Sequence, residues 1–177
     1  QLDMGILATP LEEDGLREHP LYYEPFVAFF HQDHPLLAKK RIKSTDISLD
    51  EMWLLTDGHC FRDQVINFCG LSGKTAHPGL NYTTGSLDSI VRVVHKSSGY
   101  TLLPLLAAEE LPEQLKAQIR HFEPPIPVRE ISIITREDFL KVKLIEKIKK
   151  IVLEIVPEKL HSEDDEGERI PILHKND

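Results

Sequence analysis

Short apolar runs recur along the chain and predict a series of buried strands. Runs of about four to eight apolar residues, bounded by turn residues, are typical of strands in a sheet that is covered on both faces. The pattern predicts strands over residues 2–9, 22–30, 50–56, 80–84, 100–104 and 128–136. The last of these alternates between apolar and polar positions, which indicates a strand with two different faces.

Between these runs, apolar residues recur every three or four positions, which is the period of an amphipathic helix. This spacing predicts a helix that starts just after Asp57, and further helices over residues 87–98, 107–119 and 137–156. Asp57 and Ser86 stand where an N-cap is expected, because their side chains can accept a backbone N–H of the first turn. Gly99 and Pro157 stand where two of the helices should end.

The last predicted helix carries one apolar stripe. We expect this stripe to pack on the protein's own core, as most such stripes do. Its members are Leu144, Ile145, Ile148, Ile151, Val152 and Ile155.

Strands that alternate with helices predict an α/β fold with mostly parallel sheets. The chain is expected to form a domain over residues 1–156, with a Gly-rich loop at 70–79. Residues 157–177 contain the run "HSEDDEGER" and are expected to form an acidic, mobile tail.

Composition narrows the class of protein. The 177 residues are 41% apolar, which is enough for a core, and carry a formal net charge of −8. That charge argues against direct contact with nucleic acid, because phosphate binding needs a basic patch. We expect no membrane span and no signal peptide, because the chain has neither the long apolar run nor the basic N-terminal segment that they require. With only two cysteines, a cytoplasmic protein with reduced thiols is expected.

The two cysteines, Cys60 and Cys69, lie nine positions apart in "DGHCFRDQVINFCG". If this segment is helical, as Phe61, Val65 and Phe68 suggest, Cys69 lies roughly on the opposite side of the helix from Cys60, about 13–14 Å along the axis. A disulfide requires Cα atoms within about 7 Å of each other. A bond between the two cysteines therefore requires the helix to unwind.

This spacing leaves two interpretations open: two inert buried thiols, or a reversible redox pair. A zinc site is disfavoured, because zinc favours closely spaced cysteine pairs and the chain has no second pair. Cys60 falls in the first turn of the predicted helix, where the positive end of the helix dipole favours a thiolate. Arg62 would favour it further, His59 could donate a hydrogen bond to a leaving oxygen, and Asp63 could orient Arg62. If the thiols are inert, Arg62 is simply a surface charge and His59 a loop residue. Asp63 then only interacts favourably with the helix N-terminus.

Several motifs resemble the regulatory domain of LysR-type transcription regulators, over residues 2–156. They are "LDMGILA", "FVAFFHQDHPLLAK" and "GSLDSIVRVVHKSSGYTLLP", together with "GHCFRDQ" and the following "FC", which are similar to the redox motif of the peroxide-sensing members. The resemblance implies a periplasmic-binding-protein-like domain of two α/β lobes, with the first lobe incomplete at its N-terminus. It also implies that Cys60 is the peroxidatic and Cys69 the resolving cysteine, with His59, Arg62 and Asp63 around the reaction.

The same resemblance implies the partners. They are hydrogen peroxide, a thiol reductant that resets the disulfide, and a second copy in a homodimer, with a tetramer when the protein is full-length. DNA would be bound only through an N-terminal winged helix-turn-helix, which this chain lacks. We expect no cofactor, no metal and no enzymatic turnover. Two alternatives are a LysR-type domain that binds a small metabolite between its lobes and a thiol peroxidase.

Overall fold

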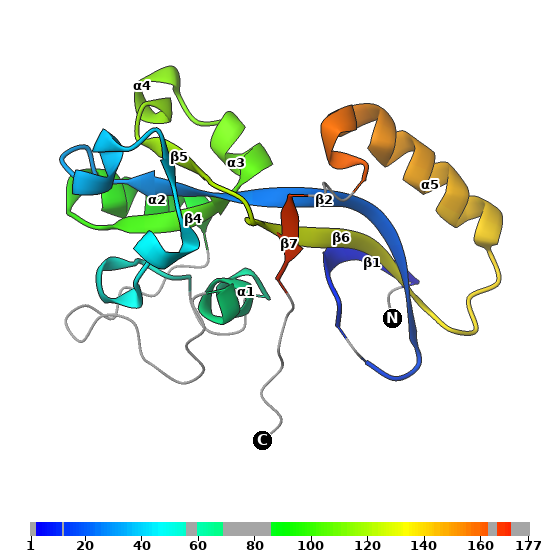
Figure 1. The fold of residues 1–177 in the computed structure, drawn as a ribbon. Coiled ribbons are helices and arrows are strands. Elements are labelled where there is room, and N and C mark those ends of the chain that lie inside the picture. The colour runs from blue at the N-terminus through cyan, green and yellow to red at the C-terminus, as the bar shows by residue number, and fades with distance from the viewer. Residues whose placement is uncertain (1–2, 12, 56–59, 69–85, 163–165, 171–177) are drawn as a thin grey trace.

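The computed structural model describes residues 3–11, 13–55, 60–68, 86–162 and 166–170 (Figure 1). The described strands form one sheet with the order β1-β6-β2-β5-β3, in which β4 also pairs with β2 and β7 with β6. The strands are β1 (Met4–Thr9), β2 (Leu16–Phe30), β3 (Arg41–Ile42), β4 (Tyr100–Pro104), β5 (Ile119–Phe122), β6 (Ile126–Arg136) and β7 (Gly167–Arg169). The helices are α1 (Cys60–Phe68), α2 (Leu87–Lys96), α3 (Leu105–Glu109), α4 (Glu113–Lys116) and α5 (Val142–Ile155).

The long strand β2 connects the two halves of the molecule (Figure 1). Its first part pairs with β6, which also pairs with β1, and α5 covers this half. Its last part lies between β4 and β5, in the half that carries α1 to α4. The two halves correspond to the two expected α/β lobes.

Successive side chains at the end of β2 point to opposite faces of the sheet, as the pleat requires. Phe26 and Phe30 enter a core that contains Val65 of α1, while Val27 and Phe29 enter a second core under α2 and α3. All four β2 side chains are at most 1% exposed. The continuous apolar run in this strand is therefore explained by burial on both faces.

The expectation of mostly parallel sheets is wrong. Of the six strand pairings in the described residues, the four that β1, β2, β4, β5 and β6 make with one another are antiparallel. Only β3 with β5 and β6 with β7 are parallel. The reason is that β2 lies between β4 and β5 and runs opposite to both. Those two strands, joined by helices as expected, point the same way but are not direct neighbours.

The predicted strand over residues 50–56 is also wrong. The segment begins in a 3-10 turn, Leu49–Glu51. Its described residues pair with β4 through one isolated β-bridge, between Met52 and Tyr100, rather than as a strand. Met52 and Leu55 are buried by packing, with exposed fractions of 0% and 7%. The apolar run correctly predicted that the segment is buried, but a buried segment need not be a strand.

Between residues 107 and 119, the structure has two short helices and the start of a strand where one helix was predicted. The helix α3 ends at Glu109, α4 begins after Pro112, and β5 starts at Ile119. Proline lacks a backbone N–H and its ring clashes with the preceding turn, so the helix cannot continue through Pro112.

The segment after α5 is not simply a mobile tail. Glu158–Leu160 form a 3-10 turn with Leu160 buried, and β7 pairs in parallel with β6. Ile170, just after β7, is 5% exposed and belongs to the same core as Phe26 and Val65. The prediction of a mobile tail followed from the acidic run and overlooked Ile170, the apolar residue that comes directly after it.

The apolar stripe of α5 is buried only in part. Ile145 is 3% exposed, and Ile148 and Val152 pack partly against the same core. Leu144, Ile151 and Ile155 are 40%, 48% and 79% exposed. The stripe is therefore wider than the surface that this chain offers to it.

The remaining predicted elements are confirmed or lie outside the described residues. The strands at 2–9, 22–30, 100–104 and 128–136 correspond to β1, β2, β4 and β6, and the helix after Ser86 corresponds to α2. Ser86 occupies the N-cap position of α2, although its side chain makes no capping hydrogen bond. Asp57, the loop at 70–79 and the strand at 80–84 lie outside the described residues.

Gly99 follows α2 in a backbone conformation with φ of +76°. A Cβ at this position would lie 2.2 Å from the backbone oxygen of Glu51. Glycine is required there for both reasons, and it allows the chain to turn from α2 into β4.

Candidate redox site

The helix α1 presents its apolar side to one core of the protein. Phe61, Val65 and Phe68 recur at helical spacing. Phe61 stacks on Phe26 with ring centroids 5.3 Å apart, and Phe68 meets Phe122 edge-on at 5.3 Å. Val65 is 1% exposed. These contacts confirm the predicted helix and explain why it forms here, since short helices depend on packing for stability.

Cys60 is the first residue of α1, which confirms its predicted place in the first turn. The N–H groups of a first turn have no partner within the helix, and their partial positive charge stabilises an anion such as a thiolate. Arg62 and Asp63 follow in the same turn, and both side chains are half-buried. Cys60, Arg62 and Asp63 therefore lie in one helical turn, and their roles around a redox reaction stay predictions.

The helix ends at Phe68, one residue before Cys69. Cys69 and His59 lie outside the described residues, so their places relative to Cys60 stay predictions. The helical segment itself agrees with the prediction that Cys60 begins a helix that a disulfide to Cys69 would have to disrupt.

Two charged residues near α1 were missed by the sequence interpretation. The guanidinium of Arg129, on β6, lies 5.5 Å from the centroid of the Phe61 ring, next in sequence to Cys60. It also pairs with Glu24 of β2, with 2.6 Å between Nη2 and Oε2. The Glu24 side chain is only 2% exposed. Charged residues inside two apolar strands are seldom buried unpaired, and that rule was the available signal for this pair.

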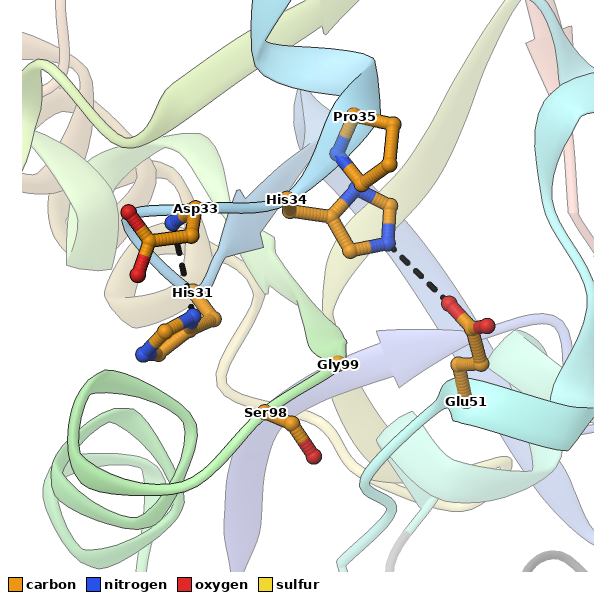
Figure 2. A pocket seen from close by; sticks show the side chains of 7 residues that line it. All are labelled: His31, Asp33, His34, Pro35, Glu51, Ser98 and Gly99. Atoms are coloured by element: carbon orange, nitrogen blue, oxygen red, sulfur yellow. Dashed lines mark hydrogen bonds and ion pairs between the residues drawn. The ribbon is translucent and has the colours of Figure 1, made fainter.

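A separate pocket of about 270 Å³ lies at the far end of β2, and Figure 2 shows its lining side chains. His34 dominates it: its Nδ1 accepts the N–H of Leu36 at 3.2 Å, and its Nε2 lies 3.2 Å from Oε2 of Glu51. Nδ1 thus serves the local turn, while Nε2 contacts a carboxylate of the separate 3-10 turn Leu49–Glu51. The lining residues are His31, Asp33, His34, Pro35, Glu51, Ser98 and Gly99. Arg62 and Asp63, the redox candidates whose side chains the structure describes, are not among them.

The described residues contain no group of three or more His, Cys, Asp or Glu side chains that could hold a metal ion. Within that same part of the chain, no helix is long and apolar enough to cross a membrane.

Residues 1–154 match the family model of the LysR substrate binding domain. The chain belongs to this family. Among curated relatives of this LysR domain, a probable hydrogen peroxide-inducible genes activator of Mycobacterium leprae is 34% identical over 160 residues, covering 90% of this chain and 51% of the relative. The transcriptional dual regulator OxyR of Escherichia coli K12 is 33% identical over 138 residues, covering 77% and 44%. The chain thus spans about half the length of the curated relatives it matches.

Solved structures give the same relationship for the LysR domain. Reduced OxyR from Porphyromonas gingivalis superposes with a TM-score of 0.82 at 32% identity, covering 96% of this chain and 77% of that one. The reduced OxyR regulatory domain from Pseudomonas aeruginosa gives 0.69 at 31% identity, covering 84% and 71%. Similarity to these OxyR regulatory domains also agrees with the expected periplasmic-binding-protein-like fold.

Proposed function

We propose that this LysR domain is the hydrogen peroxide sensor of a DNA-binding transcription regulator and that it is switched by a reversible disulfide between Cys60 and Cys69. The main support is the position of Cys60 at the N-terminus of α1, in a chain related to hydrogen peroxide-inducible activators. The helix dipole there favours the thiolate that peroxide chemistry needs.

The proposed reaction has two steps. The Cys60 thiolate attacks one peroxide oxygen, so that an S–O bond forms, the O–O bond breaks, and the departing hydroxide takes a proton to become water. The sulfur is oxidised to a sulfenic acid as the peroxide is reduced. Cys69 then attacks the sulfenic sulfur, which forms the disulfide and releases a second water. An external dithiol or two monothiols reverse the change.

The neighbouring residues have distinct proposed roles. Arg62 stabilises the Cys60 thiolate by its charge, His59 donates a hydrogen bond to the departing oxygen, and Asp63 orients Arg62. The disulfide disrupts α1 because its two cysteines are too far apart on a helix. This rearrangement would change the contact between two copies of the domain.

The output belongs to the whole protein. We propose that DNA is bound by a separate N-terminal winged helix-turn-helix, that the regulatory domains form a homodimer, and that the full-length protein forms a tetramer. A cytoplasmic location with a thiol reductant would allow the disulfide to be reset.

The direct test is to add one equivalent of hydrogen peroxide to the reduced protein and to count free thiols. The wild-type protein should lose both thiols and yield a linked Cys60–Cys69 peptide. Cys60→Ser should keep its remaining thiol, and Cys69→Ser should stop at a sulfenic acid that a carbon nucleophile traps. Oxidation of Cys60→Ser at the wild-type rate would refute the proposal.

The two alternatives predict different results. A metabolite-binding domain would bind its ligand equally well after Cys60→Ser. A thiol peroxidase would consume peroxide steadily, over many cycles per second, when a thiol reductant is present.

A further inference from the structure

The helix α1 is attached to the end of the chain through a buried hydrogen bond. The side-chain Nε2 of Gln64, in the middle of α1, donates to the backbone oxygen of Ile170 at 3.1 Å. Gln64 is 0% exposed. Ile170 lies in the same core as Val65, the residue after Gln64. A hydrogen bond and a shared apolar core therefore connect the two segments, and Figure 1 shows α1 beside the lower end of β7.

The strand β7 is in turn held on the sheet. The N–H of Ile170 donates to the oxygen of Val128 on β6 at 2.9 Å. Arg169 forms an ion pair with the buried carboxylate of Glu130, 2.9 Å away, and lies 5.0 Å above the ring of Tyr23. Residues 166–170 thus form a strap between α1 and the central strands, and the strap lies beyond the residues 1–154 that match the family model.

We infer that this strap holds α1 in its helical form and so sets the balance between the dithiol and the disulfide. The inference rests on the proposed function. A Cys60–Cys69 bond cannot form on an intact helix, because the two ends are too far apart. The Gln64–Ile170 hydrogen bond and the core that Val65 shares with Ile170 depend on the helical form of α1 and therefore favour the dithiol. Weakening the strap should favour the disulfide.

The second polar atom of the Gln64 amide limits how strongly the strap stabilises α1. Its Oε1 is buried and accepts no hydrogen bond from any of the described residues. An unpaired buried acceptor destabilises the state that buries it. The hydrogen bond of Nε2 therefore stabilises the helical form of α1, and the burial of Oε1 destabilises it. This limited stability suits a helix that has to unwind when the redox state changes.

Ile170→Ala is the test variant and Glu168→Ala the matched control, because Glu168 is an exposed residue of the same strap. The first measurement is the dithiol–disulfide equilibrium of the two cysteines in defined thiol buffers. Ile170→Ala should shift it at least tenfold towards the disulfide, or about 30 mV for this two-electron couple. Glu168→Ala should match the wild type.

The second measurement is hydrogen exchange of α1 amides in the reduced Cys69→Ser background, which cannot form the disulfide. Ile170→Ala should exchange at least tenfold faster over α1, again with Glu168→Ala unchanged. If thermal melting shows that Ile170→Ala is unfolded, Ile170→Val takes its place, with a smaller shift in the same direction in both measurements.

The outcomes separate the two proposals. If the wild-type protein forms no Cys60–Cys69 disulfide, the proposed function fails, while the exchange measurement still tests the strap. If the disulfide forms but the variant of Ile170 leaves both the equilibrium and the α1 exchange at wild-type values, the strap inference is refuted and the proposed function stands.

Discussion

Arg62 follows Cys60 by two positions in the first turn of α1, and its side chain is half-buried. If its charge stabilises the thiolate, Arg62→Ala should raise the pKa of the Cys60 thiol. The reactive fraction falls about tenfold for each pKa unit once the pKa lies above the working pH. We therefore expect peroxide oxidation near neutral pH to slow by roughly tenfold or more. Thiolate absorbance against pH and the rate of thiol loss measure both effects.

Arg62→Lys is the matched control for this prediction. It keeps the charge but replaces a planar guanidinium by a point charge, so it should restore only part of the rate. A surface ion pair would contribute little to any of these quantities. If Arg62→Ala leaves both the thiol pKa and the rate unchanged, Arg62 has no part in the site.

At the scale of elements, only part of the apolar stripe of α5 is buried. Ile145 is 3% exposed and Ile155 is 79% exposed, although both belong to the same stripe. Ile145→Ala should lower the free energy of unfolding by about 2–5 kcal/mol, because it leaves a cavity in the core. Ile155→Ala should change it by no more than about 0.5 kcal/mol. Urea denaturation of the reduced protein measures both, and equal losses would contradict this assignment of the helix face.

At the scale of the whole molecule, we expect the chain to self-associate as a two-fold dimer, as the LysR-type resemblance implies. Each copy carries a formal net charge of −8, so like-charge repulsion opposes association. Added salt screens that repulsion, so the dimer fraction should rise between low and physiological ionic strength. Sedimentation velocity at micromolar concentration checks this. A monomer at every salt concentration would argue against the dimer.

The spacing of apolar residues along the chain predicted most of the strands and helices. The runs of β1, β2, β4 and β6 and the helices α1, α2 and α5 were all visible, because alternation and helical spacing record which side chains face the core. The position of Cys60 at a helix start followed in the same way. The LysR-type relationship was also readable, since it rests on motifs in the sequence itself.

Tertiary structure alone decided how these elements meet. The Arg129–Glu24 ion pair joins residues 105 positions apart, and the Gln64–Ile170 hydrogen bond joins residues 106 positions apart. The insertion of β2 between β4 and β5 is equally non-local. A residue's own neighbours in sequence carry no record of such partners, because the pattern reports only that a side chain is buried. Which surface buries it is determined when the whole chain folds.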